Sequence, residues 1–237
     1  MTDNLSGLPG RPVAVLISAN GEWQSVLDLL SPLHVARLPL GEAFVSADFD
    51  ENILFFHSGW GKTRSAAACQ YVIDRFHPRL IINLGTCGGL EGFARVGEIL
   101  LVDSTVMYDI IERMDDPEAA LDYYRAQADT SWLPERLPEN TFRAGIASAD
   151  QDIDFRNHRL LTEEFKVPAA DWESAAIAWV AKMNATAFLI LRGISDLVSP
   201  SASETDANPD LWFKRTRQIM TKLLHDLPFY LAYSKNL

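Results

Sequence analysis

The chain has 237 residues, enough for a single large α/β domain, since such folds often exceed about 200 residues undivided. Hydrophobic residues make up 48% and charged residues 22%, which is a globular composition that excludes disordered and membrane-spanning classes. The net charge of −11 argues against a nucleic-acid partner, because phosphate backbones are bound by clusters of Lys and Arg.

The two cysteines, Cys69 and Cys87, form no disulfide framework and are typical of a reducing compartment. Residues 1–12 are polar and rich in Gly and Pro, without the apolar region of a signal peptide. No apolar run is long enough to cross a bilayer. We therefore expect a cytoplasmic protein with one domain over residues 1–237, in which residues 1–11 are flexible.

Short apolar runs alternate with longer amphipathic stretches, which is the pattern of βαβ units. In chain order, strands are predicted at 13–18, 52–57, 80–84, 99–102, 142–148 and 187–191. Helices are predicted at 23–30, 62–76, 154–165, 173–183 and 209–233, the last of them broken near Pro228. The segment 108–140 has no regular pattern, and we expect a long surface excursion with some helix around 117–127.

Three predicted strands run into small or polar residues, at 18–20, 85–89 and 192–196. In open α/β sheets ligands bind beyond the carboxyl ends of strands, so these ends could converge on one pocket. Glycines there would allow a ligand to approach the backbone closely. Each glycine cluster taken alone favours the simpler interpretation of a tight strand-to-helix turn.

Asp196 follows the apolar strand AFLIL by a few residues and is expected to be partly buried. Burial would raise its pKa toward a value suited to a general acid, whereas nearby Arg192 would lower it. The alternatives are an N-cap of a following helix or an ion pair with Arg192. On residue type alone these alternatives are favoured over catalysis.

Asp171 and Glu173 flank Trp172 at the start of an Ala-rich helix. Acidic residues are favoured at a helix N-terminus by the helix dipole. A carboxylate there could also accept both hydroxyls of a ribose while the Trp packs on the sugar. Glu22 and Trp23, beside the first strand end, leave the same choice between helix cap and active-site carboxylate.

Other catalytic, metal-binding and cofactor-binding motifs are missing from the sequence. The five histidines have no metal-ligand spacing, and no Ser-His-Asp or Cys-His arrangement stands out. The glycines at 85–89 have the wrong spacing for a P-loop or a dinucleotide fingerprint. We expect no metal and no cofactor. The aromatic residues of the C-terminal helix are assigned to the core or a subunit interface.

Four segments in order carry a more specific signal: SGWGKTRSAAA (58–68), INLGTCGGLEGFARVGEILLVD (82–103), DWESAAIA (171–178) and LRGISD (191–196). Together they resemble the nucleoside phosphorylase/nucleosidase superfamily, and within it the methylthioadenosine/S-adenosylhomocysteine nucleosidases most closely. The resemblance spans residues 13–224. It implies a single-domain α/β fold with three αβα layers around a mixed, partly barrel-like central sheet, acting as a homodimer or higher homo-oligomer.

The resemblance also implies roles for individual residues. Asp196 matches the acid that protonates the purine at N7 as the glycosidic bond breaks, with Ser195 and Arg192 positioning it. Glu173 matches the glutamate that holds the ribose hydroxyls. Trp172 matches the methionine that packs on the sugar.

Further positions match the substrate-binding segments. Thr86 falls where the family has a Ser or Thr facing the nucleophilic water or phosphate, and Cys87 and Gly88 follow it in the same segment. Ile153 matches the position whose main chain reads the base edge. Asp152 stands where the nucleosidases have a phenylalanine that stacks on adenine, which favours a base or sugar with donor groups.

Two differences from the family pattern concern the residues that would hold the nucleophile. Similar phosphorylases bind phosphate with arginines at positions taken here by Gln24, or a neighbour, and by Asn83. Their absence favours water over phosphate, although Arg64 could substitute. Nucleosidases of the family activate water with a glutamate that aligns with Trp23. Either the local turn shifts Glu22 into that place, or the water is held differently.

These observations predict a purine nucleoside N-ribosidase that hydrolyses the glycosidic bond, with Asp196 and Glu22 as the catalytic residues. Methylthioadenosine or adenosylhomocysteine is the default substrate. A purine nucleoside phosphorylase with a rearranged phosphate site is the alternative. A catalytically inactive nucleoside-binding protein is the third hypothesis.

Overall fold

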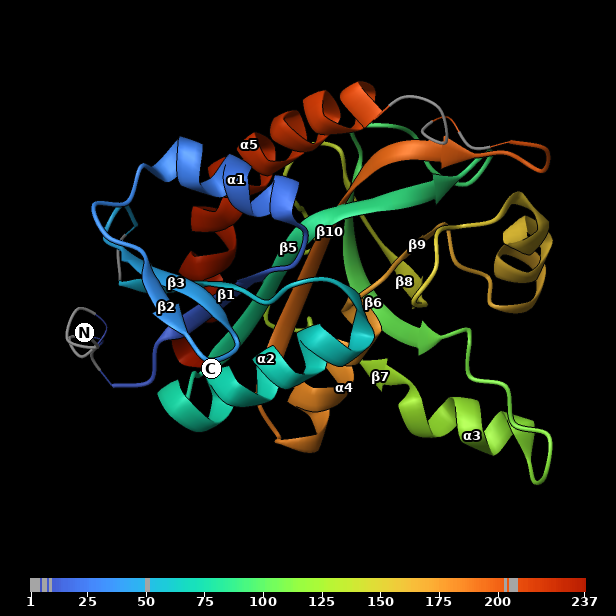
Figure 1. Cartoon of the computed structure of the whole chain (residues 1–237), viewed down its shortest axis with the longest axis horizontal. Helices are drawn as coiled ribbons and strands as arrows, with labels where there is room; N and C mark the ends of the chain where they lie inside the picture. The colour runs from blue at the N-terminus through green and yellow to red at the C-terminus, as the bar shows by residue number, and fades with distance from the viewer. Residues whose placement is uncertain (1–4, 6–7, 9, 50–51, 203, 205–208) are drawn as a thin grey trace.

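The computed structural model describes residues 5, 8, 10–49, 52–202, 204 and 209–237. A ten-stranded mixed sheet lies between two helical layers (Figure 1). One layer contains α1 (Asn20–Leu30) and α5 (Pro209–Tyr233), and the other contains α2 (Gly61–Phe76) and α4 (Ser174–Met183). The predicted three-layer αβα architecture is confirmed. The flexibility expected for residues 1–11 concerns positions that lie mostly outside the described residues.

The central strand β1 (Val13–Ile17) is buried on both faces and pairs in parallel with β4 (Ile53–His57) and β5 (Leu80–Leu90). Its odd-numbered side chains join the core under α5, and its even-numbered ones join the core under α2, as the two-residue period of a strand requires. Continuous burial explains why these strands read as uninterrupted apolar runs. β3 (Gly41–Ser46) and β2 (Ala36–Leu38), which were not predicted, extend the sheet beyond β4.

Part of the sheet closes on itself. β10 (Ala187–Val198) pairs with both β5 and β6 (Ile99–Met107), and β6 pairs with β8 (Thr141–Ser148). The short strand β9 (Ala169–Asp171) then bridges β8 and β5, which completes a five-stranded ring. The expected partly barrel-like sheet is thereby confirmed.

The prediction that the strands at 80–84 and 187–191 end in turns is wrong. β5 continues through the glycines to Leu90, and β10 continues through Asp196 to Val198, because each finds hydrogen-bond partners in the ring. Asp196 therefore caps no helix. A β-bulge between Ile194 and Asp196 shifts the register there. Of the three strand ends considered for a turn into a helix, only the first is confirmed, since β1 stops at Ile17 and α1 begins at Asn20.

The remaining segments differ in detail from expectation. Instead of one helix over 154–165, the chain forms a 3₁₀ turn (Phe155–Asn157) and a π-helical turn (Leu160–Glu164). Helix α3 (Pro117–Tyr124) confirms the helix expected within 108–140, and β7 (Ala126–Gln127) follows it. α5 runs through Pro228 without the predicted break, and a 3₁₀ turn (Ser234–Asn236) follows it. In the described part of the chain, no helix has the length and apolar character needed to cross a membrane.

Candidate active site

Glu22 lies in the first turn of α1 and points toward β5. It is 1% exposed, and its Oε1 accepts hydrogen bonds from Thr86 N at 2.6 Å and Thr86 Oγ1 at 2.9 Å. Its Oε2 accepts a bond from Ala19 N at 3.0 Å, which fixes the carboxylate at the start of the helix. Trp23 instead turns into the core, where its ring stacks on His57 with centroids 5.3 Å apart. The local turn thus places Glu22, and not the next residue, against Thr86.

Arg192, on β10, is fully buried, and three carboxylates of the site lie around its guanidinium. Its Nε lies 2.9 Å from Asp171 Oδ2, its Nη2 lies 3.5 Å from Glu173 Oε2, and its Nη1 lies 3.9 Å from Glu22 Oε1. A buried guanidinium requires such partners, because an unpaired charge in the interior is costly. Three carboxylates around one guanidinium leave this cluster with an excess of negative charge.

Gly85 explains how Arg192 and Glu22 can approach each other across β5. A Cβ at this position would lie 2.2 Å from Arg192 Nη1 and 2.8 Å from Glu22 Oε1. No side chain fits there without displacing one of the two charged groups. The glycine is therefore needed for space beside the strand.

Glu173 stands at the N-terminus of α4 and is buried. Burial raises the pKa of Glu173 to about 8, the carboxylates of Asp171 and Glu22 add to this rise, and the Arg192 guanidinium opposes it. Its Oε1 accepts a hydrogen bond from Gly61 N at 3.1 Å. Trp172, the preceding residue, is half-buried.

Asp196 follows the bulge in β10, and its neighbour Ser195 lies close to it. Ser195 Oγ is 2.5 Å from Asp196 Oδ1 and 3.2 Å from the carbonyl oxygen of Cys87. A hydroxyl has one proton, so Ser195 can donate it to an ionised Asp196, or accept from a protonated Asp196 and donate to the carbonyl. This pairing accommodates either protonation state of Asp196.

The residues packed next to Asp196 belong to β5 and to the segment after β8. A Cβ at Gly88 would lie 2.7 Å from Ile153 Cδ1 and 3.8 Å from Asp196 Oδ2, so these three residues meet at one point. Burial raises the pKa of the Cys87 thiol well above its usual range, which keeps it neutral and unreactive. Asp152 is exposed at the rim beside Ile153.

The positions that would hold phosphate in a phosphorylase have other partners here. Asn83 is buried, donates to Leu16 O at 3.0 Å and accepts from Arg192 Nη2 at 2.8 Å. Gln24 is exposed and donates to Asp28 at 2.8 Å. The guanidinium of Arg64 donates to the backbone oxygens of Ser58 and Leu40.

Sequence reasoning missed the residues that support the charged cluster. Ser148 and Ser174 donate hydrogen bonds to Asp171, and Ser174 also accepts one from Arg192 Nε at 2.9 Å. Small hydroxyl residues in buried strands and helix starts are too common to be singled out from one sequence. Among the described residues, no group of three or more His, Cys, Asp or Glu side chains could hold a metal ion.

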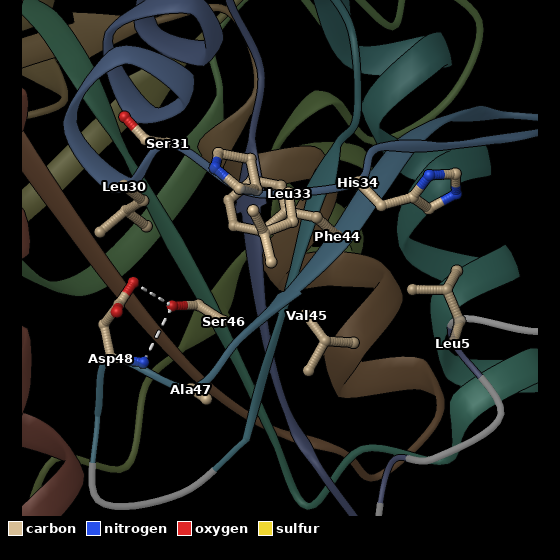
Figure 2. A pocket seen from close by; sticks show the side chains of 11 residues that line it. Leu5, Leu30, Ser31, Leu33, His34, Phe44, Val45, Ser46, Ala47 and Asp48 are labelled. Carbon is tan, nitrogen blue, oxygen red and sulfur yellow. Dashed lines mark hydrogen bonds between the residues drawn. The ribbon is translucent and has the colours of Figure 1, made fainter.

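A separate pocket of about 350 Å³ opens beside β3, between the end of α1 and the segment after β3 (Figure 2). Ser46 Oγ donates to Asp48 on its wall at 2.8 Å, and Leu33 and His34 also line it. The pocket shares no residue with the carboxylate cluster, and its mixed lining points to no particular ligand.

Comparison with known proteins gives a consistent result. The model of the phosphorylase superfamily matches residues 14–227. The 5′-methylthioadenosine/S-adenosylhomocysteine nucleosidase of Listeria welshimeri is 29% identical over 209 residues, covering 79% of this chain and 88% of that protein. The protein of the same name from Tolumonas auensis is 26% identical over 166 residues, covering 65% and 72%.

Solved structures share the fold at lower sequence identity. The 5′-methylthioadenosine/S-adenosylhomocysteine nucleosidase of Campylobacter jejuni superposes with a TM-score of 0.73 at 18% identity, covering 96% of this chain and 100% of the other. Futalosine hydrolase of Helicobacter pylori gives a TM-score of 0.77 at 20% identity, covering 96% and 98%.

Proposed function

Because the chain belongs to the phosphorylase superfamily, we propose that it is a purine nucleoside N-ribosidase, which uses water to break the bond between base and ribose. Methylthioadenosine and adenosylhomocysteine are the substrates proposed first, since the relatives at 26–29% identity carry the name of that nucleosidase.

The observation that carries the choice of water is the position of the Glu22 carboxylate. It already occupies the N–H and the hydroxyl of Thr86, the two donors that a phosphate at this place would need. A phosphate dianion would also meet a cluster with more carboxylates than guanidinium groups. Repulsion between like charges is strong in a buried site. Water bears no such penalty, and Oε2 of Glu22 has a lone pair to accept its proton.

In the proposed reaction, Asp196 gives a proton to N7 of the leaving purine while the glycosidic bond breaks. The ribose then carries positive charge, as an oxocarbenium-like species. Glu173 accepts hydrogen bonds from the ribose hydroxyls, and Trp172 packs on the sugar. Water held by Glu22 near Thr86 adds to the anomeric carbon, and Glu22 takes up its proton.

The electrostatics of the cluster match this reaction. Its excess negative charge, from Glu22 and Asp171 against Arg192 and from Glu173 when that residue is ionised, stabilises a developing cation on the sugar more than it stabilises the neutral nucleoside. At the base, Cys87, Gly88 and Ile153 form the wall, and Asp152 lies at the rim.

The experiment that tests the function is base release from a panel of purine nucleosides that differ in base and 5′ substituent. We expect free base and free sugar, with methylthioadenosine or adenosylhomocysteine among the best substrates. Tight binding without base release from any nucleoside would support an inactive binding protein and contradict the proposal.

We also propose that the protein works in the cytoplasm as a homodimer or higher homo-oligomer. The segment before α3 and the helix itself lie at the edge of the molecule and expose Ile111, Met114 and Tyr123 (Figure 1). Large exposed apolar side chains of this kind are typical of a contact surface. Light scattering after gel filtration should give a mass above that of one chain, and a monomeric mass would contradict the assembly.

A further inference from the structure

Asp171 is a buried carboxylate to which the reaction described above assigns no step. Resting on the proposed nucleosidase function, we propose that Asp171 is a positioning residue that holds Arg192 midway between Glu22 and Glu173. One guanidinium then supports the water-binding carboxylate and the ribose-binding carboxylate together.

The hydrogen bonds of Asp171 account for both of its oxygens. Oδ1 accepts from Ser148 Oγ and from Ser174 N, and Oδ2 accepts from Ser174 Oγ and faces Arg192 Nε at 2.9 Å. Asp171 is 7% exposed at the end of β9. With its lone pairs engaged by protein donors, Asp171 acts on the substrate through Arg192 and not by contact.

The distances around Arg192 show what this anchor does. Asp171 lies 2.9 Å from the guanidinium, whereas Glu173 and Glu22 lie 3.5 Å and 3.9 Å from it. Attraction in a buried site grows as the distance shortens, so without Asp171 the guanidinium would close on Glu173, the nearer of the other two carboxylates. Glu173 would then lose lone pairs needed for ribose, and Glu22 would lose its cationic neighbour.

Asp171 also acts through its charge. The charged groups that face Glu173 are Arg192 from β10, Asp171 from β9 and Glu22 from α1, and the N–H of Gly61 from α2 donates to it. Asp171 is one of the carboxylates that raise the pKa of Glu173. Removing its charge should therefore let Glu173 ionise at lower pH.

The test is Asp171→Asn, which keeps the size of the side chain and removes the charge. We expect kcat for base release to fall by about tenfold to 100-fold, as for a displaced catalytic group, with KM changed much less. If Glu173 must be ionised to bind ribose, kcat/KM rises with pH in the native protein, and this rise should move to lower pH in the variant. Asp28→Asn, which removes an equal charge at the exposed end of α1, should leave kcat and the pH dependence of kcat/KM unchanged.

Ser148→Ala and Asp171→Glu complete the set. Ser148→Ala removes one hydrogen bond to Asp171 but keeps its charge, so the pH dependence should stay in place. Asp171→Glu restores a carboxylate opposite Arg192 and should recover most of the lost kcat. A failure of Asp171→Glu to recover any activity, when correctly folded, would overturn the proposal.

Titration of the Glu173 side-chain carboxyl by ¹³C NMR separates this proposal from the proposed function, because it needs no turnover. A lower midpoint in Asp171→Asn supports the proposal, and an unchanged or higher midpoint overturns it. Loss of stability alone, with kcat and its pH dependence unchanged per folded molecule, would also overturn it. Absence of base release by the native protein would contradict the nucleosidase function and leave the NMR result to decide the role of Asp171.

Discussion

At the scale of single residues, the protonation of Glu173 couples the site to folding. Its pKa is raised from 4.5 to about 8 in the folded protein, chiefly by burial. Between these two values the folded state holds a proton that the unfolded state has released. The resulting stabilisation is complete below about pH 4.5 and is lost as the pH rises through 8.

Replacing Glu173 by Gln removes this titration. The quantity to compare is the change in the free energy of unfolding between about pH 5 and pH 8.5. We expect this free energy to fall in the native protein, relative to Glu173→Gln, by on the order of 2–4 kcal/mol. Urea denaturation at a series of pH values measures the difference. Parallel curves for the two proteins would show that Glu173 carries no raised pKa.

Asp196 has a different role, because its proton is proposed to go to the substrate. Asp196→Asn keeps the hydrogen-bonding shape next to Ser195 but supplies no acidic proton. We expect kcat to fall by about 10²- to 10⁴-fold, the usual contribution of a general acid, while nucleoside binding changes little. Single-turnover kinetics together with calorimetry measure both quantities, with Asp28→Asn as the charge-matched control. Native turnover in Asp196→Asn would refute the assignment.

At the scale of elements, β5 is the strand on which the site depends. It pairs with β1 over Leu80–Leu84 and with β10 along its whole length, and its Gly85 leaves room for Arg192 and Glu22 to meet. The sequence predicted the first half of this strand from its apolar run. It could not predict that the glycines continue the strand, because glycine clusters are more common in turns and the ring that satisfies their backbone is formed by distant segments.

Gly85→Ala tests this use of space. The added methyl group would displace Arg192 or Glu22, so we expect a loss of about 1–3 kcal/mol in stability, as for an overpacked core, together with a large fall in kcat. Ile82→Val on the same strand is the matched control, since it costs about 0.5–1.5 kcal/mol of stability without touching the site. Thermal unfolding and base release compare the two. Similar kcat values per folded molecule in both variants would show that Gly85 has no special role.

At the scale of the whole molecule, the α/β class and most of the long elements could be predicted from apolar periodicity, whereas the three-layer arrangement was implied by the family resemblance. The closed ring could not be predicted from periodicity, because β9 has only three residues and pairs with strands far away in the sequence. The same limit applies to the site. Asp196, Glu173 and Glu22 were candidates at strand and helix ends whose roles depended on the family resemblance, whereas the part played by Asp171 depends on contacts between β9 and β10 that no local pattern reveals.

The choice between water and phosphate is the central claim, and it follows from the arrangement of the whole site. Glu22 occupies the donors of Thr86, and the carboxylates outnumber the one guanidinium. The most direct test is to identify the sugar product of the best nucleoside substrate with and without inorganic phosphate. We predict free sugar at the same rate in both conditions. A sugar 1-phosphate that forms only when phosphate is present would contradict the account.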